Sequence, residues 1–482
     1  MTVEMHARAL DVDLLARELG NWRTSSRSGP AYYGLADAIR LLIVDGRIPV
    51  GARLPSERAM ADTLRVSRTT VTAAYAQLRE DGYLNARRGA RSTTALPIAS
   101  TAAAREEIAA PAMSLAAAAL SAPAAAVSEA FVDAVHDVTP YLHRVGHELV
   151  GVDVLREAIA ERYCRRGLAT EPDQVLVTTG ALHAFNLILT TYVQPGDRVL
   201  VEQPTYHGAL TSITTAGARP VPVAMTENGW ELDALQAAVQ QLSPTLAYLI
   251  PDNQNPTGLT MPAHDRKRLA GIIAETRTRT VIDETILDMW LDEAMPEPMA
   301  AAMTTRRDLV LTVGSMSKSF WGGLRVGWIR AERATIATIA ALRPSIDMGT
   351  PVLEQFAAAR LLAQRGDILP ERREILRARR AFLLSLLARH LPDWEPGGGY
   401  GGMSLWVRLP APMSTALSAA ASRMGLELPA GPRFGVDGTL ERFVRVPYAL
   451  PEEELSAAIE LLARAWHSVT GSSAPEPAAV VV

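Results

Sequence analysis

Short β-branched and aliphatic runs alternate with longer stretches of helical periodicity over most of the chain. Five runs have the length and composition of buried strands: QVLVTT (174–179), DRVLVEQ (197–203), LAYLI (246–250), RTVIDE (279–284) and LVLTVG (309–314). This alternation is typical of an α/β domain built on a mostly parallel sheet. Ligands of such sheets bind beyond the carboxyl ends of the strands. We therefore expect the chemistry in the polar and glycine-rich loops that follow these runs.

Two short helices are predicted nearer the N-terminus. In LPSERAMADTL, Ser56 stands at an N-cap position ahead of apolar residues at helical spacing. In VSRTTVTAAYAQLREDGYL, Ser67 is a second N-cap, and the residues behind it recur as a core stripe: Val71, Tyr75 and Leu78. Two short helices joined by a tight turn predict a helix-turn-helix.

The segment that carries these helices is basic. Residues 20–97 hold twelve arginines against six acidic residues, a net charge of +6, whereas the whole chain carries −4. A basic module on an acidic chain favours a polyanionic partner over a merely solvated face. The second helix offers side chains to a major groove, and RRGARSTT suits a β-hairpin wing along the DNA backbone. The candidate DNA-binding residues are Arg53, Ser56, Arg58, Ser67, Arg68, Thr69, Thr70, Arg87, Arg88 and Arg91.

Residues 31–94 resemble the winged helix-turn-helix of GntR-type repressors, on the motif LPSERAMADTLRVSRTTVTAAYAQLREDGYL. The resemblance implies a double-stranded DNA operator as partner. The family's wing usually carries two glycines and an aromatic residue or valine, whereas Ala90 and Arg91 stand here. The alternative for the helical pair is a module that docks another protein.

Composition divides the chain into four parts. Residues 1–97 form the predicted winged helix-turn-helix domain, and residues 98–135 are rich in Ala, Pro and Ser, as expected of a linker. Residues 136–470 form the predicted α/β effector domain, and residues 471–482 a flexible tail.

The remaining composition narrows the class of protein. A chain of 482 residues, 48% of them hydrophobic, is long enough for two or three domains. A single cysteine, Cys164, forms no internal disulfide, and no charged segment with an apolar run opens the chain. We therefore expect a cytoplasmic protein without a membrane span. Nine scattered histidines and one cysteine offer no ligand spacing typical of a metal site, so none is predicted.

Of the 48 basic residues only Lys267 and Lys318 are lysines. An arginine could supply charge at position 318, but its guanidinium stays protonated and cannot form an imine at neutral pH. Lys318 lies in SMSKSFWGGLR, one of four strand-end loops that together suit a single cofactor. Gly180 and Ala181 open a helix and can meet a phosphate, as can the polar residues Ser315, Ser317 and Arg325. Asn255 offers an amide and Asp283 a carboxylate for a protonated ring nitrogen, which indicates pyridoxal 5′-phosphate (PLP) held as a Schiff base.

The order of these motifs, TTG, EQPTYHG, NQNPTG, VIDE and SMSK with GLRVGW, resembles that of fold type I aminotransferases. With the N-terminal module, the chain resembles MocR-type regulators: a winged helix-turn-helix fused to PLP-dependent large and small domains. The resemblance implies that Lys318 forms the internal aldimine, Asp283 pairs with the pyridine nitrogen, Asn255 donates to the ring hydroxyl and Tyr206 stacks on the ring. It also implies that Gly180, Ala181, Ser315, Ser317 and Arg325 hold the phosphate.

The resemblance extends to the effector and the assembly. Arg445 aligns with the arginine that binds a substrate carboxylate, with Arg442 as the alternative. The family forms homodimers, in which Tyr141 could reach the neighbouring subunit's cofactor. Thr285 and Ile286 stand where relatives often have a tyrosine for the ring hydroxyl, which bears on whether transamination occurs. GGGYGG (397–402) begins the small domain's sheet in this comparison rather than a nucleotide loop.

Three functions fit these features. The first is a DNA-binding transcriptional regulator that senses PLP, or an amine or amino acid, through an aldimine at Lys318. The second is an active aminotransferase with an accessory DNA-binding module. The third is a binding protein in which PLP is only structural. The basic module on an acidic chain favours the first, because an enzyme gains nothing from concentrating near DNA.

Overall fold

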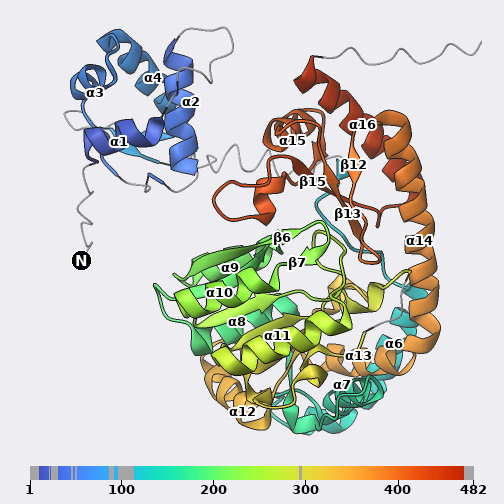
Figure 1. The fold of residues 1–482 in the computed structure, drawn as a ribbon. Coiled ribbons are helices and arrows are strands. Elements are labelled where there is room, and N and C mark those ends of the chain that lie inside the picture. The colour runs from blue at the N-terminus through green and yellow to red at the C-terminus, as the bar shows by residue number, and fades with distance from the viewer. Residues whose placement is uncertain are drawn as a thin grey trace, which may run out of the picture. The chain divides into compact units, whose positions relative to one another are not determined.

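The computed structural model describes residues 10–20, 22, 31–44, 47–48, 52–85, 92–95, 113–292 and 296–471 (Figure 1). The chain divides into two compact units, Met1–Ala110 and Pro111–Val482. Each unit has its own hydrophobic core, and each is described below by itself. Within the described residues, no helix combines the length and the apolar character needed to cross a bilayer.

The first unit contains the predicted helix-turn-helix. Ser56 and Ser67 cap its two helices, each accepting a hydrogen bond from a backbone N–H within the first turn. Arg65 adopts a left-handed conformation (φ 53°) between the helices, which reverses the chain. The elements are α1 (Val12–Leu19), α2 (Ala31–Val44), α3 (Glu57–Leu64), α4 (Arg68–Glu80), β1 (Leu84–Asn85) and β2 (Thr93–Thr94).

An eight-stranded sheet forms the centre of the second unit. All five predicted strands are present in it. The strands are β4 (Val175–Thr178), β5 (Arg198–Gln203), β6 (Arg219–Thr226), β7 (Gly229–Trp230), β8 (Leu246–Leu249), β9 (Thr280–Asp283), β10 (Val310–Ser315) and β11 (Gly327–Arg330). Their order is β4-β11-β10-β9-β8-β5-β6-β7. Only β11 and β7 run antiparallel to their neighbours, so the other strands end at the same edge of the sheet.

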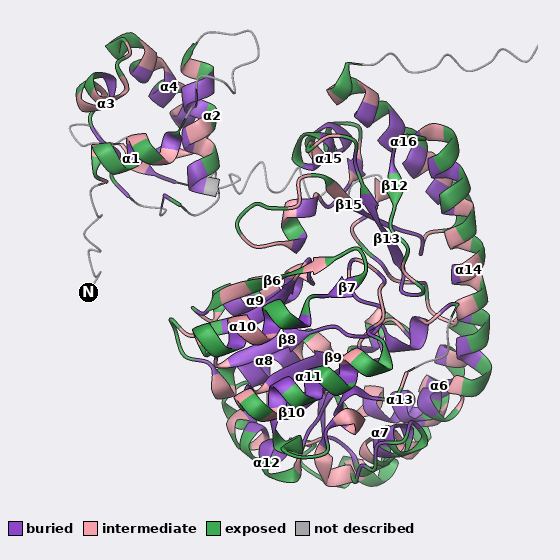
Figure 2. Ribbon diagram, in the orientation of Figure 1, coloured by how far each residue is buried: buried purple, intermediate pink, exposed green. Residues whose placement is uncertain are grey.

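Helices cover both faces of this sheet, and alternate strand residues feed two cores. Val199 and Val201 pack with one core, whereas Leu200 between them packs with the other. The strands β4, β8, β9, β10 and β11 are accordingly buried on both faces, whereas β6 near the sheet edge is largely exposed (Figure 2). The helices of this part are α7 (Asp153–Arg165), α8 (Ala181–Tyr192), α9 (His207–Thr215), α10 (Leu232–Leu242), α11 (Ala263–Thr276), α12 (Arg333–Leu342) and α13 (Val352–Ala363).

The C-terminal part of the second unit forms a smaller layer beside the sheet (Figure 1). A three-stranded antiparallel sheet, β12-β13-β15, is packed with helices, and the long α14 runs beside it. The GGGYGG segment connects β12 and β13 of this sheet, and its glycines allow close backbone packing, because a Cβ on Gly399 would lie 2.6 Å from the backbone of Gly258. The elements are α14 (Arg365–His390), β12 (Glu395–Pro396), β13 (Ser404–Arg408), α15 (Ser414–Arg423), β14 (Leu426–Glu427), β15 (Phe443–Pro447) and α16 (Glu452–Thr470).

The predicted linker of residues 98–135 is wrong over its second part. Strand β3 (Met113–Ser114) pairs in parallel with β14, and α6 (Ala124–Asp137) lies against α13. Leu115, Leu120 and Val127 are buried in the core of the second unit. Alanine and serine gave this segment the composition of a linker, but its few large side chains are enough to anchor it. Residues 98–112, and residues 472–482 of the predicted tail, lie outside the described residues.

Candidate functional site

A cavity of about 360 Å³ lies at the edge of the sheet where the parallel strands end. It brings together nine of the ten residues predicted to hold the cofactor or the effector carboxylate: Ala181, Tyr206, Asn255, Asp283, Ser315, Ser317, Lys318, Arg325 and Arg445. The tenth, Gly180, is the N-cap residue of α8 next to Ala181. Arg442 does not line the cavity; it is exposed and donates to the carbonyl of Pro410 (2.7 Å).

Lys318 follows β10 and points into the cavity. Burial lowers the pKa of its amine to about 8, and the charge of Arg445 adds to this effect. Its Nζ donates a hydrogen bond to the carbonyl of Ala118 (2.8 Å). A depressed pKa leaves more of the amine neutral near physiological pH, which is the state that attacks a carbonyl carbon.

Buried polar contacts hold the loop that carries Lys318. The neighbouring Ser319 donates from its hydroxyl to Asp288 Oδ2 (2.6 Å). Asp288 also accepts a hydrogen bond from Arg162 Nη1 (2.9 Å), and both side chains of this ion pair are buried. Asp288 thus links the loop that carries Lys318 to a buried arginine of α7, and breaking this buried pair would leave an uncompensated charge, so the contact holds the loop in place.

Asp283 ends β9 and is a buried carboxyl group. Its Oδ2 accepts from the hydroxyl of Tyr248 (2.6 Å) and its Oδ1 from the backbone N–H of Thr285 (2.7 Å). Burial raises its pKa despite the opposing hydrogen bonds, and within the described part of the chain it forms no ion pair. A buried carboxylate with hydrogen bonds but no cation is a site for a positively charged ligand group.

A small anion could be held where β11 passes the start of α8. Arg325 Nη2 donates to the carbonyl of Thr179 (2.9 Å), beside Gly180. Gly180 has a φ of +100°, which favours glycine, and a Cβ there would lie 2.8 Å from that nitrogen. The hydroxyl of Ser315 lies 3.0 Å from that of Ser317. A guanidinium, two hydroxyls and a helix N-terminus therefore converge on one corner of the cavity.

Arg445 lies on β15 and lines the same cavity. Its Nη2 donates to the carbonyl of Ala116, and its Nη1 lies 3.4 Å from Asn255 Oδ1. Its Nε is buried without a hydrogen-bond partner. Burial lowers the pKa of this guanidinium to about 10, so it still carries its charge at neutral pH. A buried arginine with an unused donor is suited to an anionic ligand.

A buried network positions Asn255. The preceding residue, Gln254, donates from Nε2 to Glu202 Oε1 (2.9 Å) and to the carbonyl of Pro204 (2.7 Å). Glu202 also accepts from the indole of Trp230 (2.6 Å) and is fully buried. Burial raises the pKa of Glu202 to about 7. The network ties the loop after β8 to the loop after β5, which carries Tyr206.

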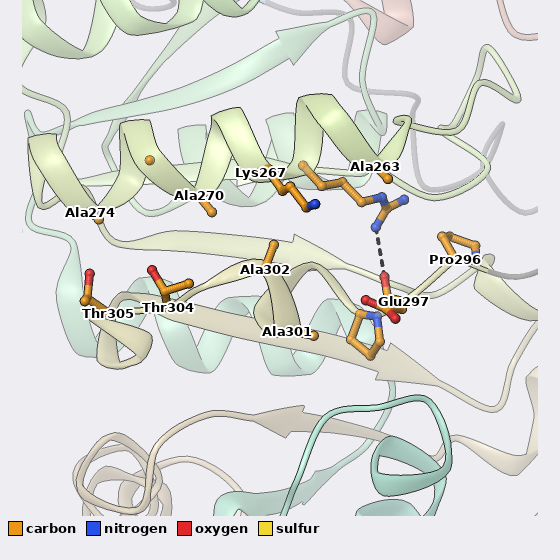
Figure 3. A pocket seen from close by; sticks show the side chains of 13 residues that line it. Ala263, Lys267, Ala270, Ala274, Pro296, Glu297, Ala301, Ala302, Thr304 and Thr305 are labelled. Carbon is orange, nitrogen blue, oxygen red and sulfur yellow. Dashed lines mark hydrogen bonds between the residues drawn. The ribbon is translucent and has the colours of Figure 1, made fainter.

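The other lysine lies in a different cavity, of about 570 Å³, beside α11. Figure 3 shows Ala270 and Ala274 of α11 facing the segment that contains Ala301 and Ala302. Lys267 itself is exposed. Among the residues that line this cavity there is no aspartate, and the one acidic residue, Glu297, uses its backbone carbonyl to accept from Arg266 (3.3 Å). This cavity therefore lacks the combination of a buried amine and a buried aspartate that Lys318 and Asp283 provide in the first cavity.

In the first unit, Ser67 and the first turn of α4 carry four of the predicted DNA-binding residues. Arg68 is exposed, as are Arg53 and Arg58. Ser67 is occupied in capping: it accepts from the backbone N–H of Thr70 (3.1 Å) and lies 2.7 Å from the hydroxyls of both Thr69 and Thr70. The wing residues Arg87, Arg88 and Arg91 lie outside the described residues, although β1 and β2 on either side form an antiparallel pair.

Comparison with known families agrees with both halves of this description. The model for aminotransferase class I and II matches residues 113–462, and the model for bacterial regulatory proteins of the gntR family matches residues 31–93. The chain belongs to the aminotransferase class I and II family. Its gntR domain adds a DNA-binding helix-turn-helix, which is the composition of MocR-type regulators.

The relatives of this chain include proteins named as transcriptional regulators and proteins named as aminotransferases. YisV of Bacillus subtilis, named as an uncharacterized HTH-type transcriptional regulator, is 27% identical over 81% of this chain and 86% of its own. The probable rhizopine catabolism regulatory protein MocR of Rhizobium meliloti is 27% identical over 76% and 78%. The crystal structure of LysN, an α-aminoadipate aminotransferase of Thermus thermophilus complexed with N-(5′-phosphopyridoxyl)-L-leucine, has a TM-score of 0.68 at 28% identity, covering 77% of this chain and 95% of LysN.

The cofactor of this family is PLP, and the cavity of this aminotransferase-family chain fits it. Asp283 lacks the cation that a pyridinium would supply, and Lys318 is a buried amine with a lowered pKa. Gly180 leaves room beside Arg325 that a side chain would fill. The carboxylate of Asp283 suits the ring nitrogen of the cofactor, the amine of Lys318 suits its aldehyde, and the space between Gly180 and Arg325 suits its phosphate.

Sequence reasoning missed two features of this cavity. Tyr248, the partner of Asp283, lies within a predicted strand, and nothing in a single sequence separates it from an ordinary core tyrosine. Ala116–Ala119 line the cavity although they lie within the predicted linker. The only signal was the pair of leucines, Leu115 and Leu120, on either side of the alanines.

Proposed function

We propose that this MocR-type chain regulates transcription by coupling the cavity around Lys318 to operator binding by the helix-turn-helix. The observation that carries the proposal is the convergence of Lys318, Asp283 and Arg325 in a chain that also carries a DNA-binding domain. PLP supplies an aldehyde that a lysine amine or an external amine can bind covalently. The effector is an amine or an amino acid.

The chain's own side chains would divide the work in the cavity. Lys318 provides the neutral amine, and Asp283 holds a proton on the ring nitrogen by charge. Tyr206 covers one face of the ring, and Asn255 donates to its hydroxyl group. Thr285, which lines the cavity where relatives often have a tyrosine nearby, offers only an aliphatic hydroxyl. The phosphate is held by Gly180, Ala181, Ser315, Ser317 and Arg325.

Arg445 would bind the effector's carboxylate. Its unused Nε and the adjacent Nη2 form one side of the guanidinium fork, which matches a carboxylate geometrically once Nη2 leaves the carbonyl of Ala116. This assignment favours an amino acid over a simple amine as the effector.

DNA recognition would begin with the first turn of α4 in the major groove. Arg68 is exposed and free to reach a base edge, while Arg53 and Arg58 are placed for the phosphate backbone. Ser56, Ser67, Thr69 and Thr70 help mainly by fixing the two helix starts, because their hydroxyls and caps are internally paired. Arg87, Arg88 and Arg91 would follow the backbone from the wing.

We also propose a homodimer. On α6 and the residues after it, Val132, Val135, Leu142 and Val145 are all more than half exposed, with Val145 at 85%. A row of exposed aliphatic side chains favours a self-complementary interface. Tyr141 does not line the cavity of its own chain and packs on Phe356 instead. In the proposed dimer, Tyr141 would extend toward the cavity of the other subunit. Sedimentation of the purified protein at the mass of one chain would contradict the dimer.

Selection of bound genomic fragments, with and without PLP, tests the regulator directly. We expect a small set of fragments whose enrichment changes with the cofactor, and their neighbouring genes would indicate the effector. The rival function is an active aminotransferase, supported by the likeness to LysN. Turnover of common amino acids at about 1–1,000 per second would favour that rival. The predicted cytoplasmic location stays a prediction.

A further inference from the structure

Part of the cavity wall is a backbone segment held at both ends. We call Met113–Leu120 the strap. At its start, the N–H of Leu115 donates to the carbonyl of Glu427 (2.8 Å), and the Leu115 side chain is fully buried. At its end Leu120 is buried, and Arg372 donates to the next carbonyl, that of Ser121 (3.0 Å). The four alanines between these anchors line the cavity.

The strap's carbonyl groups occupy the two cationic groups that the proposed function assigns to ligands. Ala118 accepts from Lys318 Nζ (2.8 Å), and Ala116 accepts from Arg445 Nη2. Among the described residues, no acidic side chain forms an ion pair with either cation. Neutral backbone carbonyls are therefore the main partners of two buried charges.

A carboxylate would be a better partner for Arg445 than a carbonyl. Charge-assisted hydrogen bonds are about twice as strong as those to neutral acceptors, and a carboxylate can use two donors of the guanidinium fork at once. Ala116 and a ligand carboxylate cannot both hold Nη2 in the same position. The contact is therefore a point where the ligand and the chain compete.

We propose that the strap competes with amino-acid ligands for Arg445 and Lys318, so that a ligand carboxylate releases the strap from the cavity wall. The inference rests on the proposed function and adds a means of regulation to the same site. Since Met113 is the third residue of the second unit, a released strap acts on the chain that leads to the DNA-binding unit. Ligand binding in the cavity would thereby alter the segment that joins the two units.

Competition also predicts how the strap affects affinity. If ligands bind only when the strap is released, their apparent Kd equals the intrinsic Kd divided by the fraction of molecules in which the strap is released. Any change that loosens the strap without touching the cavity should then tighten ligand binding. Ser114 offers such a change: its hydroxyl donates to Glu427 Oε2 (2.6 Å) and accepts from the N–H of Ala116 (3.1 Å), yet it does not line the cavity.

The first experiment measures hydrogen–deuterium exchange of residues 113–120 in the full-length protein. The probes are N-phosphopyridoxyl-glycine and N-phosphopyridoxyl-methylamine, which differ only by a carboxylate. We expect exchange in the strap to rise with the glycine adduct and to stay unchanged with the methylamine adduct. Unchanged exchange while the glycine adduct is bound, as shown by calorimetry, would overturn the strap and leave the proposed function standing. Failure of both adducts to bind would overturn both.

The second experiment compares Ser114→Ala with Ser121→Ala, a matched substitution at an exposed serine just beyond the strap. Loss of the Ser114 hydrogen bonds should tighten binding of the glycine adduct about fivefold. Ser121→Ala should bind it as the unmodified protein does. Equal affinities of all three proteins for the adduct, with the same strap exchange, would contradict the competition.

Discussion

Tyr248 and Asp283, on the neighbouring strands β8 and β9, are joined by a hydrogen bond of 2.6 Å from the phenol to Oδ2. Burial raises the pKa of Asp283, and this hydrogen bond works in the opposite direction by stabilising the ionised form. Tyr248 thus favours the ionised form of the Asp283 carboxyl group even without a bound cation. This tyrosine on the adjacent strand supports the aspartate itself, whereas the tyrosine that relatives often use for the ring hydroxyl is replaced here by Thr285 and Ile286.

Replacing Tyr248 with Phe should weaken PLP binding about tenfold. A hydrogen bond to a charged group contributes roughly 1.5 kcal/mol, and its loss raises the pKa of Asp283 further, so less of the carboxyl is ionised to meet the ring nitrogen. Titration followed by cofactor absorbance measures the affinity. Tyr192→Phe is the matched control, because Tyr192 ends α8 and stacks with Arg279 away from the cavity. Equal losses in the two variants would contradict the role of Tyr248.

The rate at which the protein combines with PLP should follow the neutral fraction of Lys318. With a pKa of about 8, lowered from 10.5 by burial, this fraction rises about tenfold between pH 7 and pH 9 and then levels off. An ordinary lysine would instead continue to gain about tenfold per pH unit up to pH 10. Stopped-flow absorbance at several pH values distinguishes the two profiles. A rate that keeps rising above pH 9 would show that the amine is not perturbed.

Arg68→Ala should weaken DNA binding about tenfold or more and leave the PLP spectrum unchanged. An arginine that reads a base edge contributes about 1–3 kcal/mol of discrimination, and Arg68 lies exposed at the start of α4. Arg40→Ala removes the same charge from α2, where Arg40 pairs with Asp37 (2.9 Å). Fluorescence anisotropy on a fragment recovered by the genomic selection gives both affinities. Similar losses for the two variants would indicate a non-specific charge effect.

Much of the fold could be predicted because its signals are local. DRVLVEQ and RTVIDE are buried on both faces, so uninterrupted β-branched runs mark them as parallel strands. Ser56 and Ser67 marked the starts of α3 and α4 as N-caps, with apolar residues at helical spacing behind them. The site followed from the loops after these strands, because parallel strands that end at one edge bring their loops together.

What the sequence could not predict depends on partners far along the chain. β6 reads RPVPVAMT, and its prolines hide a strand that pairs with β5. Arg166 and Glu284, 118 residues apart, form a buried ion pair of 2.8 Å that no local pattern announces. The alanines of the strap carry no periodicity, so their place in the cavity wall depends on β14, which lies more than 300 residues later.

The corrected boundary makes a direct prediction about truncated proteins. A chain that starts at residue 111 keeps β3, the strap and α6, whereas one that starts at residue 136 loses them. The second chain no longer buries Leu115, Leu120 and Val127, each worth roughly 2 kcal/mol. That loss is comparable with the whole stability of a typical domain, about 5–15 kcal/mol. We therefore expect the chain from 111 to unfold cooperatively in urea and the chain from 136 to show no cooperative transition, by circular dichroism. If both chains unfold at the same urea concentration, residues 111–135 do not stabilise the second unit and belong to the linker.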